Sequence, residues 1–256
     1  MRLCFITGDI ANRCDYTGVG DYFDRLLSAI EKFESRENVF WAVGNHDIKR
    51  KGKIRESVIH NIRKSTDSAY EFEQAMLDGE TRGVITQLGM SEYIDRHRAL
   101  LGRAPAGDDF VNPHIRNTAL RDLNLIILNT CLASCDDQDT FNLHIKEPGL
   151  FSAFNDLEQN KPTFVLGHHG YEFFARPSQE ALSHILDSTG VDVYLCGHSH
   201  KLGYDIFNEA GRDIYQLTSG GIREDGLKFA FMHGEYDEKS QTVLIKPYSF
   251  SEGSRD

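Results

Sequence analysis

Cysteine is scarce in this sequence, and its few copies do not suggest pairing. The chain has 256 residues and five cysteines, an odd number at scattered spacings. A disulfide framework or a pair of zinc knuckles needs cysteines in even numbers at regular spacings. We therefore expect small buried residues or free thiols at Cys4, Cys14, Cys131, Cys135 and Cys196.

Long hydrophobic runs are also missing. The longest, around residues 123–128, is interrupted by Asn124 and falls short of the roughly 20 residues that span a bilayer. Residues 3–7 form an apolar segment that is too short for the core of a signal peptide. These features predict a cytoplasmic protein with no membrane helix.

Basic residues are outnumbered, with 28 Lys and Arg against 39 Asp and Glu and a net charge of −11. This charge argues against non-specific binding of nucleic acid through a basic surface. An anionic substrate must instead be attracted locally, for example by a bound metal. The hydrophobic share of 40% and charged share of 26% are typical of a globular chain. We expect a single domain over residues 1–256.

The order of apolar segments predicts an α/β fold. A buried strand over residues 3–7 is followed by a helical pattern over 22–33 and a second strand over 39–43. A strand, helix, strand order implies a parallel crossover, so the loops that follow the two strands should share one sheet edge. Open α/β sheets usually place their sites at that carboxyl edge.

The rest of the chain continues the alternation after a polar stretch. Residues 48–109 predict a helical insertion that covers the sheet edge, with helices near 54–63, 70–77 and 91–101. Further expected elements are a hairpin over 114–120 and 123–129, helices over 150–159 and 178–187, and strands over 163–166 and 191–196. From residue 202 onward, hairpin signals predict a second, largely antiparallel sheet.

Polar side chains follow four of these strands, each close behind a glycine that allows a sharp turn. They are Asp9, then Asn45, His46 and Asp47, then His168 and His169, then His198 and His200. Carboxylate and amide oxygens with imidazole nitrogens suit divalent manganese, iron or zinc. In an extended loop His198 and His200 point the same way, so two adjacent metals could take one each, with Asp9 shared between them.

The spacing and type of these residues resemble the calcineurin-like metallophosphoesterase superfamily. The matching motifs occur in the family's order as Gly8-Asp9, Gly44 to Asp47, Gly167-His168 and Gly197 to His200. The resemblance implies a sandwich of two mixed β-sheets flanked by helices, with two divalent metal ions.

The resemblance also implies roles for the individual residues. Asp9 would bridge the two metals, and His200 would bind one of them. The other metal would be completed by Asn45, His168 and His198. His46 would face the substrate as a proton donor or a clamp on the phosphoryl charge, and Asp47 would orient it.

One family motif is not found. No Asp-x-His precedes Asp9, and without it one metal keeps only Asp9 and His200, fewer than the three or four protein ligands of a typical site. The family's first strand is also missing. We therefore expect that this chain starts downstream of an ancestral or true start, the alternative being a natural mononuclear or degenerate member.

The expected activity is hydrolysis of a phosphoester, a small molecule or a nucleotide, by metal-activated water. Residues 10–14 lack the Asp-Arg-Gly of related protein phosphatases, and Val43 and Asp47 differ from the Arg and Glu usual there. This resembles the cyclic-nucleotide phosphodiesterase and nuclease branches and favours a diester. The alternatives are a phosphomonoesterase and a non-catalytic metal- or phosphate-binding sensor or interaction domain; the sequence does not indicate an oligomeric state.

Two further groups keep alternative interpretations. His168 and His169 could be a structural histidine and an exposed neighbour; with His168 as a ligand, His169 is expected near the substrate. The basic run at 49–53 and Arg55 could reach substrate phosphates or could be a solvated helix start. Core or surface positions without a role in the site are expected for His60, His97, His114, His144, His184 and His233.

Overall fold

The computed structural model describes most of the chain. The described residues are 3–17, 19–32, 35–105, 123–155, 157–158, 160–208, 213–221, 228–237, 239–240 and 242–251. The predicted strand over residues 114–120, with His114, lies outside them.

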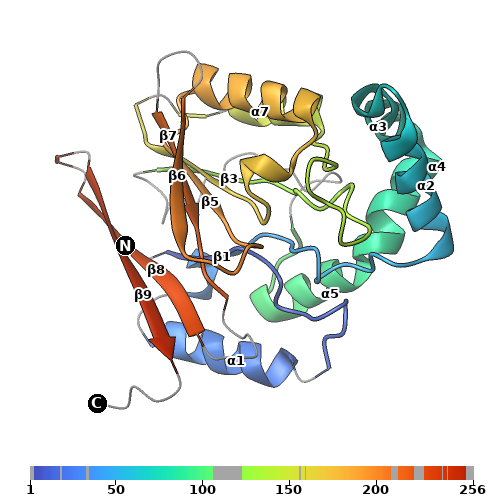
Figure 1. Cartoon of the computed structure of the whole chain (residues 1–256). Helices are drawn as coiled ribbons and strands as arrows, with labels where there is room; N and C mark the ends of the chain where they lie inside the picture. Colours follow the sequence, from blue (N-terminus) through green and yellow to red (C-terminus); the bar gives the residue numbers. More distant parts are fainter. Residues whose placement is uncertain are drawn as a thin grey trace.

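Two sheets lie face to face, with helices on the outside (Figure 1). The smaller sheet pairs β1 (Cys4–Ile6) with β2 (Val39–Trp41) in parallel. The larger has the order β3-β4-β5-β7-β6. Its strands are β3 (Asn124–Ile127), β4 (Thr163–Leu166), β5 (Val193–Cys196), β6 (Gly203–Asn208) and β7 (Asp213–Thr218). The expected α/β sandwich is confirmed.

The prediction of a largely antiparallel second sheet was wrong. Strands β3, β4, β5 and β7 are parallel, and β6 alone of these five runs against its neighbour. A helical crossover joins β4 to β5, which makes a parallel pair possible. Antiparallel pairing returns in a separate hairpin of β8 (Lys228–Asp237) and β9 (Thr242–Ser251).

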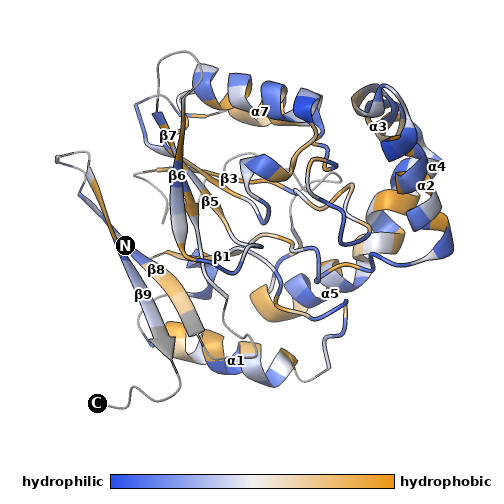
Figure 2. Cartoon of the chain, viewed as in Figure 1, coloured by the Kyte–Doolittle hydropathy of each residue, from blue (hydrophilic) through white to orange (hydrophobic). Residues whose placement is uncertain are grey.

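The period-two alternation of side chains builds the layers. Phe40 of β2 and Leu125 of β3 belong to the core between the two sheets. Trp41, the next residue along β2, faces the other way, onto α1 (Val19–Ile30) and α5 (Gly89–Leu101). On the larger sheet, α6 (Glu147–Asn155) and α7 (Arg176–Ser188) cover the outer face. Figure 2 shows the apolar side of α7 turned toward the strands.

Helices fill much of the range predicted as an insertion. They are α2 (Lys53–Lys64), α3 (Ser68–Leu77), α4 (Gly79–Gly83), the π-helix η2 (Val84–Leu88) and α5. Short 3₁₀ turns are η1 (Arg36–Asn38) and η4 (Tyr171–Phe173). In the described part of the chain no helix is long and apolar enough to cross a membrane.

Arg55 of α2 fits neither interpretation of the basic run. It is 3% exposed, and its guanidinium donates hydrogen bonds to the carbonyls of Ile85, Cys131, Leu132 and Ser134. Buried arginine needs such partners because its charge has left water. The residue therefore ties α2 to the segment 129–139, which follows β3. All five cysteines are free, as expected.

Candidate metal centre

Four loops meet at the carboxyl ends of β1, β2, β4 and β5. Nε2 of His168 lies 3.3 Å from Oδ2 of Asp9, 3.3 Å from Oδ1 of Asn45 and 3.2 Å from Nδ1 of His198. Ligands about 2.0–2.2 Å from one metal ion lie about 3.0–3.4 Å apart when they are adjacent in its shell. The three distances match that spacing.

The hydrogen bonds of His168 direct one ring nitrogen toward the cluster. Nδ1 of His168 donates to the carbonyl of Thr7 at 2.6 Å, so Nε2 carries the lone pair when the ring is neutral. Burial would lower the pKa of His168, but the Asp9 charge and the hydrogen bonds of the ring raise it, so a metal ion at Nε2 would compete with a proton. The oxygens of Asp9 and Asn45 beside it are acceptors too. Oδ2 of Asp9 is buried and makes no hydrogen bond within the described chain. Closely spaced acceptors short of hydrogens are what a divalent metal site requires.

The backbone is held in an uncommon conformation at the same place. Asp9, His198 and His200 have φ values of 57°, 63° and 57°, in the left-handed region. For residues other than glycine this costs on the order of 1–3 kcal/mol each. Gly8, at φ 101°, also has no room for a side chain, because a Cβ there would lie 2.6 Å from Nδ1 of His168. Such strain is typical of positions where a site dictates the geometry.

Asp47 holds the loops together through their backbone. Its fully buried carboxylate accepts N–H bonds from Asp9 at 3.0 Å, Ala11 at 2.9 Å and Gly44 at 2.9 Å. We expected it to orient the His46 ring, but Nδ1 of that ring is buried without a hydrogen-bond partner among the described residues. The His46 amide instead donates to Oδ1 of Asp9 at 2.7 Å. Asp47 thus holds the loop of His46 against the loop of Asp9, and its effect on the His46 ring stays a prediction.

Burial sets the charges of the centre. Burial alone would raise the pKa of Asp9, but His168 and the His46 amide outweigh it and hold that pKa well below its usual range. Burial, with the nearby Asp9 charge, raises the pKa of Asp47 to about 7. Burial and the neighbouring His168 lower the pKa of His198 to about 4. An ionised Asp9 beside a neutral His198 is a suitable ligand pair near neutral pH.

His200 lies at the solvent edge of the centre. Its side chain is exposed. Gly221 packs beside it, because a Cβ added to Gly221 would lie 3.4 Å from the Cβ of His200. His200 is not among the three residues whose atoms surround Nε2 of His168. Asp9 and His200 remain the residues proposed for a second metal.

His169 belongs to the same cluster, because its ring offers a ligand atom within 4.8 Å of those of His168 and His198. It is fully buried, and its ring centroid is 4.4 Å from that of His198. Oγ1 of Thr130 accepts the amide N–H groups of His168 at 3.4 Å and His169 at 3.1 Å, and it lies 2.9 Å from Nδ1 of His169. The expected position of His169 near the substrate stays a prediction, and its ring lies buried within the cluster.

The sequence analysis missed Thr130. The signal was present, because Asn129 and Thr130 follow the buried strand β3 after one further residue, Leu128, as the other polar residues of the centre follow their strands. Thr130 supports two histidines by hydrogen bonds instead of adding a charged or metal-ligating group, so a search for ligands passes over it.

A second group of donor atoms is a poor metal site. His60, Cys135 and Asp136 each place one ligand atom within 4.8 Å of the others. Arg63 makes an ion pair with Asp136 at 2.9 Å, and His60 bonds to the other carboxylate oxygen at 2.9 Å. A guanidinium at that position repels a cation.

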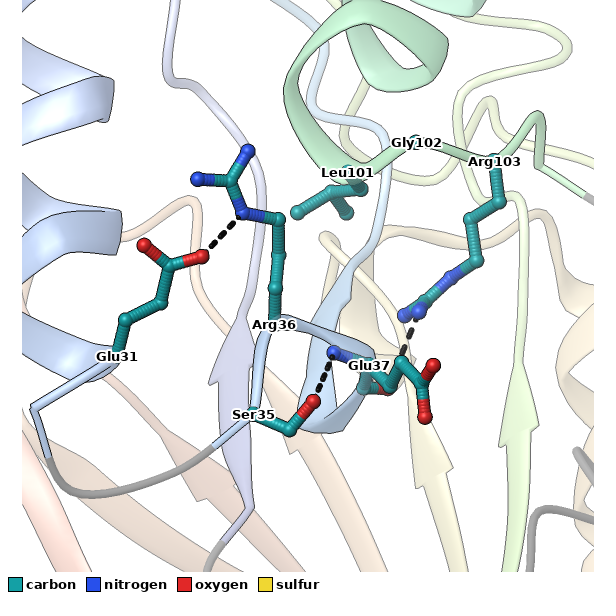
Figure 3. Close-up of a pocket in the computed structure, with 7 residues that line it drawn as sticks. All are labelled: Glu31, Ser35, Arg36, Glu37, Leu101, Gly102 and Arg103. Atoms are coloured by element: carbon teal, nitrogen blue, oxygen red, sulfur yellow. Dashed lines mark hydrogen bonds and ion pairs between the residues drawn. The ribbon is translucent and has the colours of Figure 1, made fainter.

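A surface depression near the start of β2 is not part of the centre (Figure 3). It is lined by Glu31, Ser35, Arg36, Glu37, Leu101, Gly102 and Arg103. Its arginines already have partners. Arg36 bonds Glu31 at 2.7 Å, and Arg103 donates to the carbonyls of Glu37 and Val39. We assign no function to it.

The fold and the centre together define a class: an α/β sandwich with a cluster of side chains that could hold a metal ion at the carboxyl ends of its strands. Comparison with known families agrees, because the model of the calcineurin-like phosphoesterases matches residues 3–202. The chain belongs to this family, which supports a metal-dependent hydrolase of phosphoesters. All four loops of the centre lie inside the matched range.

A relative in Bacillus subtilis (strain 168) is the uncharacterized metallophosphoesterase-like protein YydB. It is 25% identical over 228 residues, which cover 86% of this chain and 45% of the relative. The chain therefore spans about half the length of that protein.

Proposed function

We propose that the chain hydrolyses phosphodiesters with a divalent cation held by Asp9, Asn45, His168 and His198. The observation that carries the proposal is the set of three donor atoms within 3.3 Å of Nε2 of His168. These atoms come from loops that are far apart in the sequence, and a divalent cation would be a shared partner for all of them.

A bound ion of the manganese, iron or zinc type would activate water and neutralise phosphoryl oxygens. The side chain of His46 lies beside this cluster and is half-buried. Its backbone is fixed by Asp9 at 2.7 Å, which limits where the ring can move. We propose that His46 gives a proton to the leaving oxygen, a role that contributes about 10²–10⁴-fold to rate.

A second candidate function is non-catalytic binding of a metal and a phosphate ligand. It is favoured by the thin ligand set for a second metal, where the described residues supply Asp9 and the exposed His200. One cation can hold a phosphate without hydrolysing it.

Two substitutions and a control separate these functions. The protein is stripped with a chelator, reloaded with Mn²⁺ and assayed with bis(4-nitrophenyl) phosphate and 4-nitrophenyl phosphate. His46→Ala should keep the metal and lose about 10²-fold or more in turnover, whereas His198→Ala should lose the metal. His184→Ala, at an exposed position of α7, should change neither.

Equal metal loss in the His46 and His198 variants would contradict the assigned roles. Metal binding without turnover of either substrate would favour the non-catalytic function. Faster hydrolysis of the monoester would make the chain a phosphomonoesterase.

A further inference from the structure

Arg50 is a buried cation, and two nitrogens of its guanidinium group have no hydrogen-bond partner among the described residues. It follows His46 in the same loop and is 9% exposed. Nη1 donates to the carbonyl of Asp136 at 3.0 Å and to Oδ1 of Asp137 at 3.1 Å. Nε and Nη2 make no hydrogen bond with the described residues of the chain.

The charge of Arg50 is poorly balanced. Its ion-pair partner Asp137 is 94% exposed, so water and salt screen that carboxylate strongly. Burying a guanidinium is costly unless its hydrogen bonds and charge are satisfied. Arg55, on the adjacent helix, shows the satisfied case, with four hydrogen bonds to carbonyls.

Arg50 also differs from the other members of the basic run. Lys49, Lys51 and Lys53 are exposed, as expected for a solvated helix start. Arg50 is instead buried against the segment 129–139. The same segment carries Thr130, the hydrogen-bond partner of His168 and His169. Arg50 thus joins the loop of His46 to the segment that supports the histidines of the metal centre.

We propose that Arg50 binds a second phosphate group of the substrate, next to the leaving-group side where His46 acts. The planar guanidinium can present Nε–H and Nη2–H to two oxygens of one phosphate, the geometry in which arginine binds phosphate best. The preferred substrate is then a nucleotide-like phosphoester that carries a further phosphate beyond the scissile one. This inference rests on the proposed function for the position of the scissile group.

The test compares two competitors that differ by one phosphate. Adenosine 5′-monophosphate and adenosine 3′,5′-bisphosphate are titrated into the Mn²⁺-loaded protein by calorimetry and used as inhibitors of bis(4-nitrophenyl) phosphate hydrolysis. The wild-type chain should bind the bisphosphate about tenfold or more tightly than the monophosphate, as expected for charge-assisted hydrogen bonds. In Arg50→Gln the ratio of the two dissociation constants should fall to below about threefold.

Two further variants protect the test. Arg50→Lys keeps the positive charge but loses the paired N–H groups of the guanidinium, so its ratio of dissociation constants should lie between those of the wild type and Arg50→Gln. If Arg50→Gln fails to fold, a lower ratio in Arg50→Lys than in the wild type supports the proposal, and an unchanged ratio contradicts it. Lys49→Gln removes an exposed neighbouring charge and should leave the ratio unchanged.

The proposal is overturned if the wild-type chain shows no preference for the bisphosphate, or if Arg50→Gln keeps it. Calorimetry does not require turnover. A chain that prefers the bisphosphate through Arg50 but hydrolyses nothing would contradict the proposed function and leave this inference standing.

Discussion

Replacing Thr130 with valine should weaken both the fold and the metal centre. Valine has nearly the same shape, so the change removes a hydroxyl without creating a cavity. Oγ1 of Thr130 accepts two buried amides and forms a hydrogen bond with Nδ1 of His169. The variant leaves three buried polar groups without that partner.

The size of the effect follows from those three groups. An unsatisfied buried donor or acceptor costs about 1–3 kcal/mol, and the bond from His168 is long, so we expect a loss of about 3–5 kcal/mol in unfolding free energy. Urea unfolding with a chelator present measures it without a contribution from bound metal. Mn²⁺ affinity, measured separately, should fall because His168 loses part of its backbone support.

A matched control is Thr86→Val. Thr86 is also buried, but its hydroxyl donates to a single helix carbonyl, that of Arg82, at 2.8 Å. Its loss should stay below about 1 kcal/mol. Equal losses in the two variants, or an unchanged Mn²⁺ affinity in Thr130→Val, would refute the supporting role of Thr130.

Two further predictions concern a loop contact and the pH dependence of stability. Gly44→Ala would place a Cβ against the amide nitrogen and Oδ1 of Asp9, so we expect a loss of about 1–3 kcal/mol in unfolding free energy, measured in urea, and weaker Mn²⁺ binding. Gly52→Ala, with open space around it, should show neither effect, and equal effects in the two variants would contradict the prediction. Burial, partly offset by the bond to the carbonyl of Arg103, lowers the pKa of His97 to about 4; the unfolded chain, with a pKa near about 6.5, takes up the proton first as pH falls. Stability that is present above pH 6.5 is therefore lost toward pH 4, by about 2 kcal/mol of unfolding free energy between pH 7 and pH 5. In His97→Asn, urea unfolding at pH 7 and pH 5 should no longer show this loss. An unchanged pH dependence in the variant would show that His97 does not cause it.

The meeting of the four loops could be predicted from the sequence because each obeys one local rule. A buried strand followed by a glycine and a polar residue places that residue at the carboxyl edge of a parallel sheet. The structure brings the side chains of Asp9, Asn45, His168 and His198 together there. Their roles as ligands stay predictions.

What could not be predicted depends on contacts between distant segments. Asp47 was expected to hold a ring and instead binds backbone amides, because its direction is set by how the loop of Asp9 packs against it. Arg50 and Arg55 belong to one basic run, yet both are buried against the segment 129–139. The sequence carries no local mark of that packing.

The strand order of the larger sheet was hidden for a similar reason. Hairpin signals after residue 202 indicate how neighbouring segments connect. They do not indicate which strand from earlier in the sequence those segments pair with. β7 pairs in parallel with β5 and antiparallel with β6, so its long-range partner decides the character of the sheet.

The measurement that tests the central claim most directly is the ligand set of bound Mn²⁺. Pulsed electron paramagnetic resonance on the stripped and reloaded protein detects nitrogens bonded to the ion. Our account predicts coupling to two histidine nitrogens, from His168 and His198, with one lost in His198→Ala and none lost in His184→Ala. An Mn²⁺ signal without nitrogen coupling, or one that His198→Ala leaves unchanged, would contradict a metal centre at the meeting point of these loops.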